Sequence, residues 1–270
     1  MDMPATPPLV TVITPTYNAA HCVARCIASV REQTWPAIEH IVIDGGSKDA
    51  TVEVLKQAGV RHVSERDAGL YDAMSKGIRM ARGEFVHILN ADDRYSGPDA
   101  LATLVAKLRD GQLDLVHGRA RQVDEHGAEV CTFGRDVPKL ALLRKMRVAH
   151  PTVVVRRAVY ERYGAFSVGF RIAADHEFLL RVWDRIKVGF VPQVMVEMAI
   201  GGMSTDNANA VRAYRESMAA ALLHGRRPLP ALMRCHYEIV KHFIIRARKF
   251  RKHDHTDPRP LLVPVSEPVG

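Results

Sequence analysis

The sequence predicts an α/β fold in which a mainly parallel central sheet is flanked by helices. Short β-rich runs alternate with helical patterns of about 10–15 residues through the first two-thirds of the chain, as in βαβ units. The β-rich runs are almost continuously apolar, which is typical of strands that are buried on both faces. Glycine ends two of the helical patterns, at Gly59 and Gly83.

Runs of β-branched and aliphatic residues give the strands. The first run reads LVTVIT and is bounded by prolines. A hairpin is predicted over residues 122–133, with its turn at Glu125-His126-Gly127. The predicted strands span residues 9–14, 39–43, 60–64, 84–89, 113–118, 152–156 and 188–196.

Apolar residues three or four positions apart give the helices. The first predicted helix ends at Trp35-Pro36, because a residue before proline avoids the α region. The predicted helices span residues 19–33, 49–58, 70–82, 98–109, 137–146, 157–163 and 172–185.

Length and composition are those of an ordinary globular protein. The 270 residues suffice for one large α/β domain, or for one domain and a small appendage. No apolar stretch approaches the roughly 20 residues of a membrane span, and residues 1–8 lack the features of a secretory signal. Four cysteines in such a chain indicate reduced thiols and a cytoplasmic location. They are Cys22, Cys26, Cys131 and Cys235.

The net charge of +8 is concentrated near the C-terminus, where residues 226–259 hold ten Lys or Arg and three Asp or Glu. The predicted organisation is a main domain over residues 8–205, with halves at 8–118 and 119–205. A helical basic extension (206–253) follows, and the proline-rich tail (254–270) is expected to be disordered.

The predicted helix over residues 232–252 is basic and amphipathic. Two interpretations carry equal weight: the helix lies on an anionic membrane surface, or it packs on the protein with a solvated face. The first would place the protein on the inner face of the plasma membrane. Nucleic acid is not expected as a partner, because aromatic residues are not interleaved with the cations.

Polar and acidic residues follow four of the predicted strands. In open α/β sheets, ligands bind beyond the carboxyl ends of the strands, so these residues are expected to meet at one edge. They are Thr14, Tyr17 and Asn18 after the first strand, Asp44 after the second, Asp67 after the third, and Asn90, Asp92 and Asp93 after the fourth.

These segments, in this order, resemble the N-terminal half of family 2 glycosyltransferases, which have the GT-A fold. The resemblance is strong over residues 8–93 and looser to about residue 202. The segments that carry it are TPTYN, DGGSKDAT and RDAGLYDAMSKGIRMARGEFVHILNADD, followed by HPTVVVRRAVYERYGAFS and FRIAADHEFLLR.

The resemblance implies a transferase that moves a sugar, with inversion, from a nucleotide-diphospho-sugar to a hydroxyl of a glycan or glycolipid acceptor. UDP is the expected nucleotide, and surface-polysaccharide or glycolipid biosynthesis is the expected pathway. One alternative is a decayed nucleotide-sugar-binding or scaffold protein. The other is a sugar nucleotidyltransferase, which TPTYNAA disfavours because it is not a glycine-rich, cationic phosphate loop.

The acidic turn is the implied metal site. By resemblance, Asp92 with Asp93 holds Mg²⁺ or Mn²⁺ against the donor diphosphate, where a hard cation neutralises phosphate charge. Asn90 stands where the family usually has aspartate, so the resemblance assigns it to the donor ribose or phosphate. The bland alternative for this segment is a solvated turn that caps the next helix.

The nucleotide contacts are also implied by resemblance. Tyr17 is expected to stack on the base and Asp44 to accept a hydrogen bond from it, while Thr14 and Asn18 shape the loop beneath. Asp67 is expected to face the nucleotide. The residues around Asp44 also suit a tight turn that leads into a helix, and one turn can do both.

In the second half, the resemblance makes Asp175 the general base, with Glu177 in reserve. An acidic residue in the first helical turn also stabilises the helix dipole, which is the structural alternative. His150-Pro151 is expected at the acceptor site, and residues 201–204 as a loop that closes over a ligand.

Two further cations and one departure from the family pattern concern the third predicted helix. Lys76 and Arg82 are candidates for phosphate contact, although cations on an exposed helix face are common. Ser75 stands where the family is expected to have asparagine.

Overall fold

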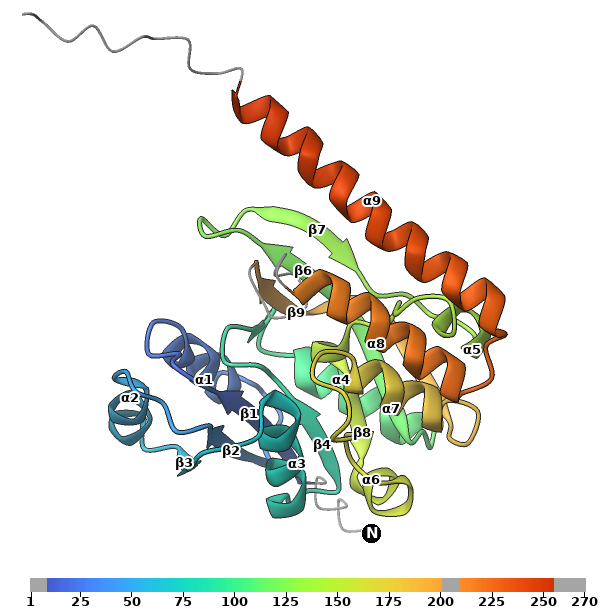
Figure 1. Ribbon diagram of the computed structural model, residues 1–270. Helices are drawn as coiled ribbons and strands as arrows, with labels where there is room; N and C mark the ends of the chain where they lie inside the picture. The colour runs from blue at the N-terminus through green and yellow to red at the C-terminus, as the bar shows by residue number, and fades with distance from the viewer. Residues whose placement is uncertain (1–8, 201–208, 255–270) are drawn as a thin grey trace, which may run out of the picture.

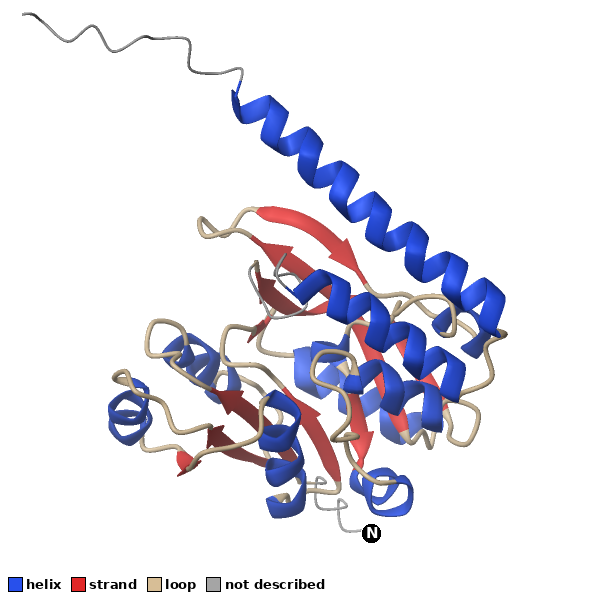
Figure 2. Cartoon of the chain, in the orientation of Figure 1, coloured by secondary structure: helices blue, strands red, loops and turns tan. Residues whose placement is uncertain are grey.

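The computed structural model describes residues 9–200 and 209–254, except for the side chains of residues 230, 243 and 245–254 (Figure 1). Within this part, nine strands form one mixed sheet in the order β3-β2-β1-β4-β8-β6-β9-β5, and β7 pairs with β6. Helices lie against the sheet in Figure 2, and α9 extends away from it.

The elements have the following bounds. The strands are β1 Val10–Thr16, β2 Ile38–Asp44, β3 Arg61–Ser64, β4 Phe85–Ile88, β5 Arg94–Tyr95, β6 Leu115–Val123, β7 Glu129–Phe133, β8 Val154–Arg156 and β9 Val188–Ala199. The helices are α1 Val23–Arg31, α2 Thr51–Ala58, α3 Leu70–Met80, α4 Ala100–Asp110, α5 Lys139–Leu142, the 3₁₀ helix η1 His150–Thr152, α6 Arg157–Tyr163, α7 Ala174–Val182, α8 Ala210–Leu223 and α9 Pro228–Asp254.

The parallel sheet predicted for the first strands is confirmed. β3, β2, β1 and β4 are parallel neighbours, and helices connect them as right-handed crossovers require. The register places Thr16, Asp44 and Ser64 side by side at the ends of their strands. The loops that carry the candidate site residues therefore leave from one edge.

The mainly parallel sheet is wrong for the second half, which is mixed. β8 lies antiparallel between β4 and β6, and β5 is antiparallel to β9, while β6 and β9 are parallel. A parallel neighbour needs a crossover of a dozen or more residues, usually a helix. The helix predicted over residues 137–146 spans only Lys139–Leu142, so no long helix separates the β6–β7 hairpin from β8.

Two layers of helices cover the sheet, and the alternation of side chains along β1 shows how. Val10 and Val12 belong to an apolar cluster with residues of α1 and α4. Ile13 points to the opposite face, where it belongs to a cluster that includes residues of α3, α6, α7 and α8. The sheet is thus buried on both faces, as its continuous apolar strands predicted.

The C-terminal helices form a pair. Ala220 and Ala221 of α8 lie in the main apolar core, beside residues of α7, and α8 also packs against α9. The C-terminal part of α9 projects beyond the rest of the protein in Figure 1. Within the described part, no helix is long and apolar enough to cross a membrane. All of the predicted loop at 201–204 and residues 255–270 of the predicted tail lie outside the described residues, while Asp254 is the last residue of α9.

Candidate active site

The loops after β1 and β2 are joined by hydrogen bonds. Asn18, whose φ of 50° is left-handed, accepts a hydrogen bond from Lys48 N through Oδ1 (2.8 Å). Asn18 N donates to Ser47 Oγ (2.7 Å), and Ala19 N donates to Thr51 Oγ1 (2.8 Å). α1 begins at Val23, later than the predicted residue 19. The two loops therefore form one connected rim.

Asp44 holds the turn of the second loop. Its carboxylate is fully buried and accepts hydrogen bonds from Gly46 N (3.2 Å), Ser47 N (3.0 Å), Ser64 Oγ (2.6 Å) and Ser47 Oγ. Oδ2 receives three of the four bonds, whereas Oδ1 receives only that of Ser47 Oγ. The tight-turn role considered for Asp44 is therefore present. Oδ1 has capacity for another donor, but the side chain is fully buried, so its contact with a base stays a prediction.

Asp67 lies directly against this turn. A Cβ at Gly45 would come within 2.5 Å of Asp67 Oδ2, so only glycine fits there without a shift of Asp67. Tyr17 leaves the neighbouring loop with 60% of its surface exposed. The rim therefore presents an aromatic ring beside a compact polar turn, a combination that suits a nucleobase and its ribose.

Thr14 lies below the rim and is fully buried. Its Oγ1 is 3.0 Å from His40 Nε2 and 3.6 Å from Cys26 Sγ. Burial lowers the pKa of His40 to about 4, so the imidazole is neutral at pH 7. Thr14 therefore has no exposed surface for direct contact with a nucleotide, and its role in shaping the loop stays a prediction.

The acidic turn after β4 concentrates negative charge. Asp93 is buried, and burial followed by the charge of Asp92 raises its pKa well above the usual value. Burial likewise raises the pKa of half-buried Asp92. Cys22, directly before α1, is affected by the same carboxylates. Burial, and then the charge of Asp92, raise the pKa of its thiol to about 11. Two carboxylates thus share a site whose surroundings disfavour their ionised forms.

These residues fit a hard divalent cation. Asn90 Nδ2 donates to Asp93 Oδ2 (3.0 Å), while the buried Asn90 Oδ1 has no hydrogen-bond partner. The donor set is therefore made of oxygen only, which Mg²⁺ and Mn²⁺ prefer. Within the described residues, no group of three or more His, Cys, Asp or Glu side chains could hold a metal by itself. Mg²⁺ usually takes one or two carboxylates together with substrate phosphates and water.

The strand that follows the acidic turn is anchored by a buried carboxylate. Glu197 of β9 accepts a hydrogen bond from Arg94 Nε (2.6 Å) and another from Arg121 of β6. Burial by itself would raise the pKa of Glu197, but the two arginines outweigh it and the net shift is downward. Because Arg94 follows Asp93 directly, this cluster fixes the exit of the acidic turn.

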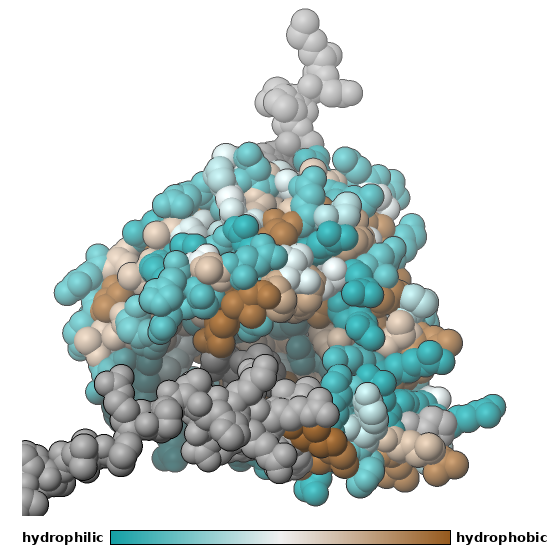
Figure 3. All heavy atoms as spheres, turned by 90° about the horizontal axis from the view of Figure 1, so that it is seen from above, coloured by the Kyte–Doolittle hydropathy of each residue, from teal (hydrophilic) through white to brown (hydrophobic). Residues whose placement is uncertain are grey.

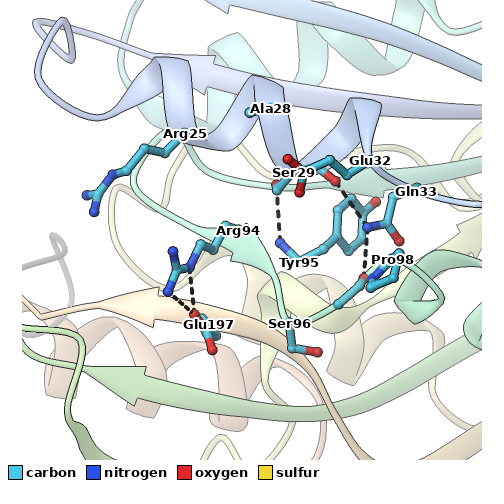
Figure 4. Close-up of a pocket in the computed structure, with 11 residues that line it drawn as sticks. Arg25, Ala28, Ser29, Glu32, Gln33, Arg94, Tyr95, Ser96, Pro98 and Glu197 are labelled. Carbon is cyan, nitrogen blue, oxygen red and sulfur yellow. Dashed lines mark hydrogen bonds and ion pairs between the residues drawn. The ribbon is translucent and has the colours of Figure 1, made fainter.

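Arg94 and Glu197 also line a hollow of about 360 Å³ between α1 and β5 (Figure 4). Arg25 reaches its edge from α1, and the hydroxyl of Ser29 accepts a hydrogen bond from Tyr95 N within it (3.3 Å). No predicted site residue lines this hollow. The hollow is therefore separate from the strand edge that carries the predicted donor-site residues.

Asp175 lies in the first turn of α7, held by two other helices. Tyr71 of α3 places its hydroxyl 3.1 Å from Asp175 Oδ1 and 2.7 Å from Ile172 O. Glu216 of α8 accepts hydrogen bonds through Oε2 from the backbone N–H groups of residues 171, 172 and 173, at 2.8–3.1 Å. The start of α7 is thereby fixed, while Asp175 itself is only half-buried.

Glu177, the reserve base, is engaged in a structural cluster. It is 4% exposed and accepts hydrogen bonds from Ser167 Oγ (2.8 Å), Arg181 Nη2 (3.1 Å) and His224 Nε2 (2.9 Å). These contacts join α7 to the end of α8. Glu177 is therefore built into the core, and Asp175 is the better-placed carboxylate for a proton transfer.

The remaining candidates have structural partners. Lys76 pairs with Glu65 (3.0 Å) and with Asp72 (3.6 Å), and Arg82 approaches Glu39. Ser75 is buried. His150 packs its ring on Phe166, and burial lowers its pKa despite the charge of Asp175 nearby. His150 therefore lies within electrostatic reach of Asp175, and its place at the acceptor site stays a prediction.

Three residues that contribute to the site were not predicted from the sequence: Tyr71, Glu197 and Glu216. The contacts of Tyr71 and Glu197 join residues about a hundred positions apart, and spacing along the chain does not reveal them. The available signal for Tyr71 was its position on the apolar face of α3, because a buried tyrosine hydroxyl usually finds a partner.

Comparison with protein families gives a match to glycosyl transferase family 2 over residues 11–163, more than half of the chain. A PGL/p-HBAD biosynthesis glycosyltransferase of Mycobacterium tuberculosis is 30% identical over 184 residues, which are 66% of this chain and 70% of that protein. An uncharacterized glycosyltransferase of the same species is 35% identical over 192 residues, or 64% of this chain and 68% of that protein.

Solved structures share the fold at lower identity. TarS 1–349 of S. aureus, in complex with UDP-GlcNAc, has a TM-score of 0.65 at 18% identity, over 87% of this chain and 72% of that chain. In the longer TarS structure this chain covers 43% of the protein. The mannosyltransferase PcManGT from Pyrobaculum calidifontis, in complex with GDP-Man and Mn²⁺, has a TM-score of 0.61 at 20% identity, over 93% and 82% of the two chains. These structures share the fold; the family match and the sequence relatives show that the chain belongs to glycosyl transferase family 2.

Proposed function

We propose that the protein transfers a sugar from a nucleotide-diphospho-sugar to a hydroxyl of a glycan or glycolipid, with inversion and with help from a divalent metal. The observation that carries the proposal is the strand edge itself. It brings together an exposed aromatic ring, the Asp44 turn and an oxygen-rich acidic turn with one buried and one half-buried carboxylate.

The donor's diphosphate would lie near the acidic turn. Asp92 and Asp93 would hold Mg²⁺ or Mn²⁺, and the unpartnered Asn90 Oδ1 faces the same buried surroundings. When bound, the cation supplies positive charge that stabilises the diphosphate leaving group. The chain's own carboxylates place it, and the Glu197 cluster keeps their turn in position.

Asp175 would take the proton of the acceptor hydroxyl as that oxygen attacks the anomeric carbon. A single attack from the side opposite the leaving group inverts the configuration, so one general base suffices. The half-buried Asp175 has access to solvent, and its backbone is fixed by Glu216. This arrangement supports Asp175 over Glu177.

The TarS complex with UDP-GlcNAc supports a UDP-sugar as donor, and the PcManGT complex with GDP-Man and Mn²⁺ supports a GDP-sugar. We propose UDP, with GDP as the competitor to be tested. A relative named for PGL/p-HBAD biosynthesis supports an acceptor in surface-polysaccharide or glycolipid assembly.

Tyr17 gives a first prediction. Tyr17→Ala is expected to weaken nucleotide binding by about 5- to 150-fold, because base–aromatic stacking is worth about 1–3 kcal/mol. Titration calorimetry with UDP and Mn²⁺ measures the effect. Tyr17→Phe retains the ring and should bind as the parent does. If Tyr17→Ala also binds like the parent, Tyr17 does not stack on the base.

The transfer itself is tested by following donor cleavage. The protein is incubated with UDP-GlcNAc or GDP-Man and Mn²⁺, and proton NMR follows the first anomer of the released sugar. The proposal expects cleavage of one donor, dependent on Mn²⁺, with the opposite anomeric configuration in the first product. Release with retained configuration contradicts inversion. If no donor is cleaved, even when glycan or glycolipid acceptors are added, the result contradicts a transferase and favours the alternative of a decayed nucleotide-sugar-binding or scaffold protein.

We also propose that α9 reaches an anionic membrane, at the inner face of the plasma membrane, where a lipid-linked acceptor would lie. α9 contains seven Lys or Arg and two Asp or Glu. Its packed side includes Ala231 and Glu238. Exposed apolar side chains three or four positions apart follow on another side: Leu229, Met233, Tyr237, Val240 and Ile244.

An anionic surface complements this helix better than a second copy does, since a second copy brings the same positive charge. Figure 3 shows a mostly hydrophilic face, on which apolar residues form small separate groups. Exposed apolar side chains together with cations are the features of helices that bind anionic interfaces.

Met233→Asp is expected to weaken binding to vesicles that contain phosphatidylserine by about tenfold or more, because an inserted apolar group is lost and a negative charge is added. Co-sedimentation measures the bound fraction. Leu140→Asp is the matched control, since Leu140 on α5 is 62% exposed and Met233 is 65% exposed. Equal loss in both variants, or no binding by the parent, contradicts the membrane proposal and favours a packed helix with a solvated face.

A further inference from the structure

Tyr71 lies where the two halves of the protein meet. It belongs to the first turn of α3, directly after the loop that carries Asp67. Its side chain is 8% exposed, and its ring lies 5.2 Å from that of Phe166. The hydroxyl has a single proton, which it shares between two acceptors: Ile172 O at 2.7 Å and Asp175 Oδ1 at 3.1 Å.

The hydroxyl acts as a donor in this setting. Burial, and then the charge of Asp175, raise the pKa of Tyr71 well above its usual value, so the phenol keeps its proton at any working pH. Asp175 Oδ1 also accepts a hydrogen bond from His176 N (2.8 Å). Both of these donors engage Oδ1, so Oδ2 is the oxygen that the described residues leave to accept a proton.

We infer that Tyr71 is a positioning residue that orients Asp175 through Oδ1, so that Oδ2 faces the acceptor hydroxyl. The inference rests on the proposed role of Asp175 as general base. Glu216 fixes the backbone before Asp175, and Tyr71 is the side chain that fixes the carboxylate. Because Tyr71 follows the Asp67 loop, residues 67–71 connect the loops that would bind the donor to the proposed base, Asp175.

Three other titratable side chains lie near Asp175 or Tyr71: His150, His176 and Glu216. His150 approaches from η1 and is held neutral by burial at pH 7. His176 lies next to Asp175 on α7, where burial lowers the pKa of its ring and Nε2 lies 2.8 Å from Leu142 O. Glu216 approaches Tyr71 from α8. Of these side chains, only that of Tyr71 makes a hydrogen bond to the Asp175 carboxylate within the described structure.

The test is Tyr71→Phe, with Tyr160→Phe as the matched control. Tyr160 belongs to the same aromatic cluster, packed on Phe178 at 4.9 Å, so its variant removes a buried hydroxyl without touching Asp175. Three quantities are measured for each variant: kcat for cleavage of the nucleotide-sugar donor at a series of pH values, the dissociation constant of UDP in the presence of Mn²⁺, and the midpoint of thermal unfolding.

Tyr71→Phe is expected to lower kcat about tenfold and to move the acid limb of the pH–rate profile upward by about one pH unit, since a hydrogen bond to a carboxylate favours its ionised form. Nucleotide binding should be unchanged, and Tyr160→Phe should keep the parental limb. If the limb of Tyr71→Phe stays in place, or both variants lose rate equally, Tyr71 is only a packing residue. An active Asp175→Asn variant would instead overturn the proposed base, so the two failures are distinguishable.

Discussion

Asp175→Asn is expected to lower the rate of sugar transfer by about 10²- to 10⁴-fold, the usual contribution of a general base. The shape of the side chain is preserved, and its Oδ1 can still accept the hydrogen bond from Tyr71. Nucleotide binding should be unaffected, because the base acts on the acceptor. Steady-state transfer assays and calorimetry with UDP and Mn²⁺ measure the two effects separately.

Glu177→Gln is the informative control for Asp175→Asn. Glu177 lies two positions away but accepts hydrogen bonds from Ser167, Arg181 and His224. Its variant should lose thermal stability and retain the parental rate at temperatures where it is folded. A fall in rate with Glu177→Gln, together with full activity of Asp175→Asn, would exchange the two roles.

Asp92→Asn is expected to abolish metal-dependent nucleotide binding and, at the same time, to stabilise the protein in the absence of metal. Burial raises the pKa of both Asp92 and Asp93. A carboxyl whose folded-state pKa is raised loses its contribution to stability as the pH rises through that pKa, so the ionised pair is unfavourable at pH 7. Removing one charge should raise the thermal midpoint by about 2–4 °C for a gain near 1 kcal/mol.

Asp110→Asn is the control, because Asp110 lies exposed at the end of α4 and its loss changes the net charge equally. It should leave both the midpoint and metal-dependent binding unchanged. Protons compete with the cation for the carboxylates, and the raised pKa values let this competition begin at a higher pH than for an ordinary aspartate, whose pKa is about 3.9. On acidification, the parental protein should therefore lose Mn²⁺-dependent binding well above pH 3.9. If Asp92→Asn destabilises the metal-free protein and still binds UDP with Mn²⁺, the acidic turn is only structural.

The parallel arrangement of β1 to β4 could be predicted from the sequence because these strands are joined by helices, and right-handed crossovers then determine a parallel sheet. The second half could not. The ten-residue helical pattern at 137–146 gives a helix of four residues, and β8 enters the sheet antiparallel next to β4. Spacing along the chain cannot show which edge of a sheet a short strand will join.

The candidate site divides in the same way. Its residues could be located because each follows a strand, but their partners could not. Asp44 accepts most of its hydrogen bonds from residues of its own turn. Thr14 is buried under the rim, and Tyr71 meets Asp175 across 104 residues of sequence. The contact between Tyr71 and Asp175 depends on how α3 and α7 come together, which local patterns do not encode.

Thermal unfolding with UDP, GDP, dTDP and CDP, each with and without Mn²⁺, tests the central claim most directly. A ligand at one hundred times its dissociation constant stabilises by about 2.7 kcal/mol, which corresponds to a shift of about 5–10 °C for a protein of this size. The account predicts such a shift for one nucleotide, UDP, and only when Mn²⁺ is present. A folded protein whose midpoint no nucleotide moves, with or without metal, would contradict a metal-assisted donor site at this strand edge.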